Sequence, residues 1–322
     1  MTVLLTAFTL GGCKKNVGTP EDNAVVETDK TKEKEDQAEY VFGYSCVDMS
    51  NPFYDTLKTS IETELETQGD SLVVKDAGSD IETQLQQVQE LIDEEVDAVF
   101  LCPVDWEKIT PALEALKDAD IPVVNLDTEV REGSLVTAFV GSDNRNAGYV
   151  CGQDLVERRP DGGAVVIVEN QNVNSVNERT TGFEEAIANS GFRVVKRITA
   201  GIASENVKEE MLSVLSEESG IDAVMCGSDR MAVRVLEALE ESGRKDMLVY
   251  SVDGSPEIKK ELSDPLSPMT GIGAQSPIGL GKTAVKTATA ILKDKDYEKS
   301  VYVETFLINR DNVEMYGTDG WQ

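Results

Sequence analysis

The sequence predicts an α/β protein built from two doubly wound, mostly parallel sheets. From Tyr40 onward, short β-rich runs alternate with amphipathic segments of helical length. Strands separated by helix-length crossovers form parallel sheets that are covered by helices on both faces. The number of strand–helix units would make a single sheet unusually wide, so two sheets are the better solution.

The predicted strands are short and rich in β-branched residues. They cover residues 41–46, 72–75, 98–102, 122–126, 136–141, 164–168, 194–198, 223–226 and 248–252. Amphipathic helices are predicted between them, among others at 55–67, 81–94, 109–118, 182–189, 207–215 and 231–241. Ligands of open α/β sheets bind beyond the carboxyl ends of the strands. The residues that follow each strand are therefore the candidates for a functional site.

Composition limits the classes of function. The 322 residues include 60 acidic and 30 basic ones, for a net charge of −30. Such a surface repels phosphate backbones, so we expect no nucleic-acid partner. The chain contains no histidine, which removes the most common general base and metal ligand. An enzyme would need carboxylate, Lys or Tyr chemistry instead, so the composition disfavours catalysis. We expect a protein that is not an enzyme and that uses neither a metal nor a cofactor.

The first 13 residues have the pattern of a signal peptide. An apolar run ends in Leu10-Gly11-Gly12-Cys13, which resembles the lipobox of bacterial lipoproteins. The resemblance implies that residues 1–13 are a lipoprotein signal peptide and that Cys13 becomes acylated. The alternative is a chance apolar start with a buried cysteine. Residues 14–39 are charged and poor in large apolar residues, which predicts a flexible tether. We expect an extracytoplasmic protein that is anchored to the cell membrane through its lipid.

The other four cysteines give no sign of metal or redox chemistry. They are Cys46, Cys102, Cys151 and Cys226, and no two of the five cysteines form a C-x-x-C pair. Small buried hydrophobic roles are predicted for all four.

Acidic, amide and aromatic residues recur after the predicted strands. Paired hydrogen bonds from carboxylates and amides, next to aromatic faces, suit the hydroxyl groups and flat faces of a sugar. None of the turns has the G-x-x-x-x-G-K pattern of a phosphate site, and the acidic residues lack EF-hand spacing. The strand ends therefore favour a sugar ligand.

Several motifs in these positions resemble one known family. In order they are Asn51-Pro52-Phe53-Tyr54, Ile121-Pro122-Val123-Val124-Asn125-Leu126-Asp127, Ser142-Asp143-Asn144, Glu178-Arg179-Thr180-Thr181-Gly182-Phe183, Ser228-Asp229-Arg230-Met231-Ala232 and Val252-Asp253-Gly254. Each motif alone is weak, but six in this order are specific. From about Tyr40 to near Ile308, the chain resembles the ribose/galactose-type periplasmic binding proteins, the cluster B solute receptors of ABC importers.

The resemblance implies a type I periplasmic binding protein fold, in which two lobes are joined by a three-segment hinge. The N-terminal lobe would comprise residues 40–142 plus 276–305, and the C-terminal lobe residues 143–275 plus 306–322. The chain would pass between the lobes near residues 142–143, near Gln275 and near residues 303–308.

The resemblance also implies a set of ligand-binding residues. Asn51, Phe53 and Tyr54 match a polar residue and the aromatic pair that packs on the sugar ring. Asp127 matches the carboxylate that binds sugar hydroxyls, and Arg179 the arginine that reaches the ring from the other lobe.

Three further matches lie in the second half of the chain. Ser228 stands where the family often has Asn, Asp253 matches the carboxylate of the C-terminal lobe, and Gln275 matches the hinge glutamine. Two additional candidates follow the strand at 98–102. They are Asp105 and Trp106, of which Trp106 either stacks on the ligand or covers the edge of the lobe.

Some positions have a plainer alternative or depart from the family pattern. Asp127, Asp143 and Asp253 also suit turns or helix N-caps, and for Asp143 we favour the cap or a hinge role. Thr128 and Cys102 replace a basic residue and an Asn of the ribose-binding members, and Ile202 falls near the position of an aromatic. These departures leave the identity of the sugar open.

The function implied is capture of a monosaccharide or related polyol by hinge closure, with delivery to the permease subunits of an ABC importer. We expect a monomer. Alternatives are a lactose-repressor-type regulator, an enzyme of another doubly wound family, and a same-fold receptor for a non-sugar signal or for a chemotaxis or sensor partner. The regulator would need a helix-turn-helix ahead of the core, where this chain has only the charged tether.

Overall fold

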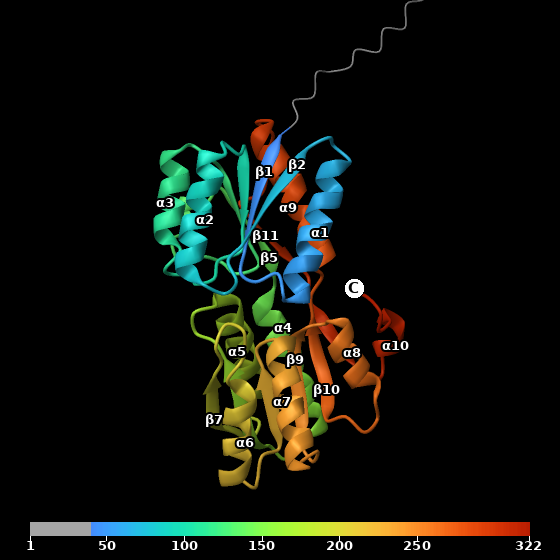
Figure 1. The fold of residues 1–322 in the computed structure, drawn as a ribbon. Helices are drawn as coiled ribbons and strands as arrows, with labels where there is room; N and C mark the ends of the chain where they lie inside the picture. Colours follow the sequence, from blue (N-terminus) through green and yellow to red (C-terminus); the bar gives the residue numbers. More distant parts are fainter. Residues whose placement is uncertain (1–39) are drawn as a thin grey trace, which may run out of the picture. The chain divides into compact units, whose positions relative to one another are not determined.

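Two six-stranded sheets organise the chain in this computed structural model, which describes residues 40–322 (Figure 1). The predicted signal peptide, the tether and Cys13 lie outside the described residues. We call the first sheet with its helices the N-terminal lobe and the second the C-terminal lobe. The α/β fold class with two parallel-dominated sheets is confirmed.

The N-terminal sheet has the strand order β11-β5-β4-β3-β1-β2, and all of its pairings are parallel. Its strands are β1 (Val41–Cys46), β2 (Ser71–Asp76), β3 (Ala98–Leu101), β4 (Val123–Leu126), β5 (Ala138–Ser142) and β11 (Ser300–Val303). One face packs on α1 (Pro52–Glu66) and α9 (Pro277–Leu292), and the other on α2 (Ile81–Asp93) and α3 (Thr110–Asp118). A short 3-10 helix, η1 (Gly133–Leu135), precedes β5.

The C-terminal sheet has the strand order β12-β10-β9-β8-β6-β7, in which β12 alone is antiparallel to its neighbour. Its strands are β6 (Gly163–Glu169), β7 (Phe192–Thr199), β8 (Ala223–Cys226), β9 (Leu248–Asp253), β10 (Met269–Ala274) and β12 (Phe306–Asn309). The helices α6 (Val207–Glu217), α7 (Asp229–Ser242) and α8 (Pro256–Ser263) cover one face, and α4 (Asn144–Arg158) and α5 (Asn174–Ile187) the other. A last short helix, α10 (Val313–Tyr316), follows β12.

The chain crosses between the two sheets after β5, after β10 and between β11 and β12. Two of these crossings are bonded to each other. Asn146 Nδ2 donates to the Thr305 carbonyl oxygen at 2.9 Å, and Thr305 Oγ1 donates to the Asp143 carbonyl oxygen at 2.9 Å. Asp143 also caps α4 by accepting from Asn146 N at 3.0 Å. The cap role that we favoured for Asp143 is the one observed.

Helices α4 and α5 lie unusually close together because glycines face each other's backbones. A Cβ on Gly148 would lie 1.8 Å from the Arg179 carbonyl oxygen, and one on Gly182 would lie 1.9 Å from the Arg145 carbonyl oxygen. Only glycine permits this approach. The contact fixes the backbone of Arg179 against α4.

Two further observations concern the described residues as a whole. Cys46, Cys102, Cys151 and Cys226 are free thiols with no exposed surface, as predicted for small buried hydrophobes. In residues 40–322 we find no helix with the length and apolar character needed to cross a bilayer.

Candidate ligand-binding site

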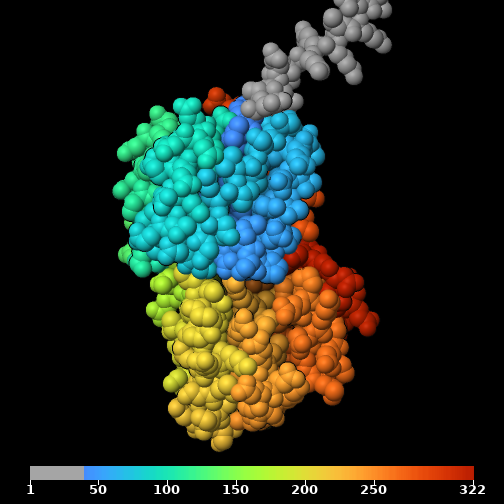
Figure 2. Space-filling view, in the orientation of Figure 1, coloured from blue at the N-terminus to red at the C-terminus, as the bar shows by residue number. Residues whose placement is uncertain are grey.

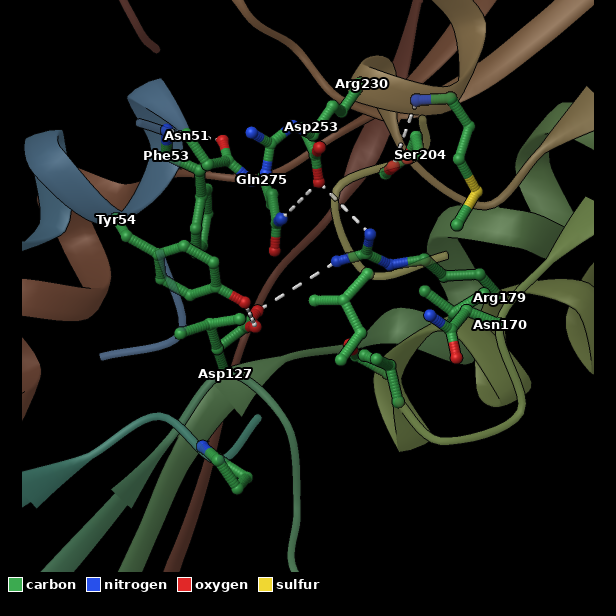
Figure 3. Close-up of a pocket in the computed structure, with 18 residues that line it drawn as sticks. Asn51, Phe53, Tyr54, Asp127, Asn170, Arg179, Ser204, Arg230, Asp253 and Gln275 are labelled. Atoms are coloured by element: carbon green, nitrogen blue, oxygen red, sulfur yellow. Dashed lines mark hydrogen bonds and ion pairs between the residues drawn. The ribbon is translucent and has the colours of Figure 1, made fainter. Parts of the chain in front are cut away.

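A cavity of about 60 Å³ lies between the carboxyl ends of the two sheets. One water molecule needs about 10–15 Å³ of cavity volume measured in the same way. The cavity therefore has the size for a small polar molecule and not for a polymer. All eight residues matched to the family's ligand contacts line it (Figure 3): Asn51, Phe53, Tyr54, Asp127, Arg179, Ser228, Asp253 and Gln275. The structure thus brings together residues that are up to 224 positions apart in the chain.

Helix N-termini present four of these residues. Asn51 caps α1, and its side chain accepts from Phe53 N at 3.0 Å, which places Phe53 and Tyr54 in the first turn at the cavity. Ser228 caps α7 by accepting from Met231 N at 3.4 Å. The capping role of Asn51 and Ser228 therefore coexists with their place in the cavity wall.

Asp127 is buried at the end of β4, with 4% of its surface exposed. Its Oδ2 accepts from the Tyr54 hydroxyl at 3.2 Å and from Thr128 Oγ1 at 3.3 Å. Burial and the nearby Asp253 raise the pKa of Asp127 to about 6, although the Arg179 charge opposes the shift. Burial also raises the pKa of Tyr54 well above its usual value, so the phenol keeps its proton and acts as a donor.

Arg179 reaches the cavity from α5 and lies between the two site carboxylates (Figure 3). Its Nη1 donates to Asp253 Oδ1 at 3.1 Å and to the Gly227 carbonyl oxygen at 2.8 Å, and its Nε donates to Asn144 Oδ1 at 2.7 Å. Its Nη2 lies 4.0 Å from Asp127 Oδ1. A single guanidinium therefore balances two buried carboxylates that come from different lobes.

Asp253 ends β9 and connects Gln275, in the crossing after β10, with a second buried acid, Asp229. Gln275 Nε2 donates to Asp253 Oδ1 at 2.7 Å, and the backbone N–H of Asp229 donates to Asp253 Oδ2 at 3.2 Å. The Asp229 carboxyl group, at the start of α7, accepts from Ser251 Oγ and from the backbone of Gly254 at 3.0 Å. Burial, with Asp253 close by, raises the pKa of Asp229 to about 7.

Both site carboxylates have unusual backbone conformations. Asp127 has φ 63° and Asp253 has φ 135°, in the left-handed half of conformational space that L-residues rarely adopt. Such strain persists only where the surroundings enforce it, and it concentrates at functional sites.

Two acceptor atoms of the cavity have no hydrogen-bond partner, although both are buried. They are Asp127 Oδ1 and Gln275 Oε1. Leaving a buried acceptor unpaired costs about 1–3 kcal/mol, and more for a charged group. The cavity therefore offers two acceptors to the donor groups of a small molecule.

The two lobes also contact each other around the cavity. Arg230 Nη1 donates to Asp48 Oδ2 at 2.8 Å, and Thr128 Oγ1 and Ser175 Oγ share a hydrogen bond of 2.8 Å. These contacts join the carboxyl ends of the two sheets at points on the cavity rim.

Two sequence candidates are not brought to the cavity. The Asp105 carboxylate accepts from the backbone of Glu107 and Lys108, both at 3.0 Å, ahead of α3. Trp106 meets the other lobe through its backbone, since its N–H donates to the Asn172 carbonyl oxygen at 3.1 Å. Neither residue lines the cavity.

Sequence reasoning missed a larger part of the wall, most of it in the C-terminal lobe, on the loops after β6 and β7 and at the starts of α5 and α7. Beside Ile202, which we noted as a departure from the family pattern, the lining includes Val47, Pro103, Asn170, Val173, Ser175, Val176, Ser204, Arg230 and Met231. Arg230 and Met231 lay within a motif that we used, and Val47 and Pro103 directly follow predicted strands, but the others had no signal in a single sequence. Among the described residues there is no cluster of three or more acidic or cysteine side chains that could hold a metal ion.

Comparison with known proteins agrees with this architecture. Residues 42–296 match the family model described as the periplasmic binding protein domain. The chain is 31% identical over 264 residues to the ribose import binding protein RbsB of Bacillus subtilis, covering 82% of this chain and 85% of that protein. It is 32% identical over 218 residues to the galactofuranose-binding protein YtfQ of Escherichia coli, covering 63% and 67%.

Solved structures give the same result. An ABC transporter solute-binding protein from Mycobacterium smegmatis with bound glycerol superposes with a TM-score of 0.82 at 27% identity, over 88% of this chain and 99% of that one. A solute-binding protein from Bacillus halodurans with bound myo-inositol gives 0.80 at 25% identity, over 88% and 98%.

A cavity between two doubly wound lobes, lined by carboxylates, an arginine and aromatic rings, defines a solute-binding protein. The chain belongs to the periplasmic binding protein domain family, and the relatives that it matches include sugar-binding proteins and solute-binding proteins of ABC transporters. It is an extracytoplasmic binding protein and not an enzyme. The predicted resemblance to the ribose/galactose type is confirmed.

Proposed function

We propose that this protein captures a monosaccharide or a related polyol between its lobes and delivers it to the permease of an ABC importer. The unpaired acceptors Asp127 Oδ1 and Gln275 Oε1 carry the proposal. These acceptors require hydrogen-bond donors from the ligand, and hydroxyl groups are such donors. Hydroxyl groups also add no charge to the site, where the Arg179 guanidinium is already shared by Asp127 and Asp253.

The proposed contacts are those of the eight matched residues. Asp127, Asp253 and Gln275 accept from hydroxyls, and the Arg179 guanidinium donates to ring or hydroxyl oxygens. The rings of Phe53 and Tyr54 cover the apolar face of the sugar. A hydroxyl of the wrong configuration would leave one buried partner unpaired, which is the basis for discrimination between epimers.

The proposed lobe boundaries place the hinge at the crossings after β5, after β10 and between β11 and β12, and closure about them would enclose the ligand. We also propose that Cys13 carries the lipid that keeps the protein, as a monomer, beside its permease. Metabolic labelling with a radioactive fatty acid tests the anchor. Loss of the label in Cys13→Ser would support it, and label that remains would refute it.

A thermal-shift screen tests ligand capture. Ligand stabilises the folded state by RT ln(1 + [L]/Kd), so 1 mM of a ligand with a Kd of about 10 µM adds about 2.7 kcal/mol. The panel is D-ribose, D-allose, L-arabinose, D-tagatose and myo-inositol, chosen because relatives or solved structures bind these or closely related compounds. Selective stabilisation by one or two members is expected. No shift with any monosaccharide or polyol would refute the proposal.

A further inference from the structure

Residues 320–322 cross from the C-terminal lobe to the N-terminal lobe beside the cavity. Figure 2 shows the red end of the chain on the boundary between the blue N-terminal lobe and the orange part of the C-terminal lobe. Trp321 and Gln322 are both partly buried. None of the matched family motifs includes them.

A buried lysine of the C-terminal lobe holds this segment. Lys259, on α8, has no exposed surface, and its Nζ donates to the Gly320 carbonyl oxygen at 2.6 Å and to Gln322 Oε1 at 3.3 Å. Burying an ammonium group is costly unless it is paired, so these two acceptors are needed by Lys259 itself. The segment is therefore attached to the C-terminal lobe and not simply laid across it.

Gln322 contacts the backbone of two proposed ligand-binding residues. Its Nε2 donates to the Asp253 carbonyl oxygen at 3.1 Å and also to the Gln275 carbonyl oxygen. A Cβ on Gly254, which has φ +95°, would lie 2.4 Å from Gln322 Nε2, so the close approach depends on that glycine. The Gln322 amide thus joins the end of β9 to the hinge crossing after β10.

Trp321 extends from this anchor to the other lobe. Its ring meets the Phe53 ring edge to face, with centroids 5.9 Å apart and planes at 72°, and it packs against the core of the N-terminal lobe. Phe53 in turn meets Tyr54 edge to face at 5.4 Å. An indole carried by one lobe therefore supports the aromatic pair of the other.

We propose that Trp321 and Gln322 are positioning residues of the ligand site, and that Trp321 must separate from Phe53 whenever the lobes open. Gln322 sets the backbone of Asp253 and Gln275, and Trp321 holds the Phe53 ring against the cavity. The inference rests on the proposed function, because it assumes that Phe53, Asp253 and Gln275 bind the ligand.

Calorimetric titration tests the positioning role, with the panel sugar that gives the largest thermal shift as the probe. Trp321→Ala should weaken binding about three- to tenfold, the effect of one edge-to-face aromatic pair, and Trp321→Phe should restore most of it. Gln322→Glu keeps the acceptor for Lys259 but cannot donate to the two carbonyl groups, so it should also weaken binding. Asp319→Ala, directly before this segment, is the matched control and should bind normally.

Fluorescence gives a readout that a merely structural role would not move. The chain has two tryptophans, so Trp106→Phe leaves Trp321 as the only one. Its emission should shift on addition of the probe, while Trp321→Phe, which retains Trp106, serves as the comparison. If Trp321→Ala does not fold, this fluorescence measurement still tests whether Trp321 changes its surroundings when the ligand binds.

Unchanged affinity in Trp321→Ala and Gln322→Glu, or unchanged Trp321 emission on binding, would overturn this inference alone. If no panel member binds the unaltered protein, the proposed function fails and the inference fails with it.

Discussion

Replacing Asp127 by Asn should separate ligand affinity from stability. The carboxyl group is buried, one oxygen has no partner, and its pKa is raised from 3.8 to about 6. A shift of about 2 units corresponds to roughly 3 kcal/mol of stability lost when the group is ionised. The charge is therefore retained at a cost to the unliganded protein.

The expected magnitudes follow from these terms. Asn removes the buried charge but leaves an amide donor unpaired, which costs about 1–3 kcal/mol. Unliganded Asp127→Asn should thus be as stable as the unaltered protein at pH 7, or more stable by up to roughly 2 kcal/mol. Loss of a charged acceptor should weaken ligand binding by roughly 10- to 100-fold.

The pH dependence gives a second signature of the same group. Because the pKa of Asp127 is higher in the folded than in the unfolded protein, the folded state binds its proton more tightly. Its contribution to stability is full below pH 3.8 and is lost as the pH rises through about 6. The stability difference between Asp127→Asn and the unaltered protein should therefore grow in favour of the variant across this range.

Calorimetric melting at several pH values and ligand titration at pH 7 are the assays. Asp80→Asn is the matched control, because Asp80 caps α2 at the surface with a lowered pKa and Asn caps equally well. A variant that melts several degrees lower without ligand, yet binds with unchanged affinity, would refute the reasoning about Asp127.

Three other substitutions test separate features. Arg179→Ala leaves two buried carboxylates without their cation, so circular-dichroism melts should show a loss of about 3–5 kcal/mol and titration no binding; near-normal stability would contradict the buried pairing. Arg230→Gln removes the ion pair with Asp48 between the lobes. It should weaken ligand binding about two- to fivefold at low salt, and by less in 0.5 M NaCl because salt screens the pair. A loss of affinity that does not depend on salt would argue against an electrostatic role. Gly148→Ala forces α4 away from α5 and should cost at least about 1–3 kcal/mol in denaturant unfolding, and Gly220→Ala, with open space around it, serves as its control.

Most strands were predictable because their β-branched runs are distinct from the polar segments around them. Strands β1 and β8 have the predicted bounds, and the other seven predicted strands begin and end within two residues of the observed ones. Three strands, β10, β11 and β12, are missing from the predicted set. The sequence of β10, Met-Thr-Gly-Ile-Gly-Ala, includes two glycines that weaken the β signal. The structure explains Gly273, since a Cβ there would lie 2.3 Å from the Ala147 carbonyl oxygen of α4.

Helix α4 was not among the amphipathic helices that we named, for a related reason. It buries Ala147, Gly148, Cys151 and Gly152, so close backbone packing takes the place of the large apolar stripe that marks an amphipathic helix. The helix was therefore hidden by the same small residues that allow it to approach α5.

The site residues that follow strands were predictable, because the carboxyl ends of parallel strands all lie at the same edge of a sheet. Loop residues such as Asn170 and Ser204 were not, because nothing in a single sequence specifies how a loop folds back. The contact of Trp321 with Phe53 joins residues 268 positions apart and depends on the arrangement of both lobes. Long-range contacts of this kind leave no local pattern.

The burial of the four thiol groups in residues 40–322 affects how the protein can be labelled. Burial raises the pKa of Cys46 to about 12 and also raises those of Cys102, Cys151 and Cys226, so none of them forms the thiolate that reacts with maleimides. With Cys13 replaced, a fluorophore can be attached to one introduced surface cysteine without removing any native one. The scaffold is thus ready for conversion into an optical sensor of its own ligand.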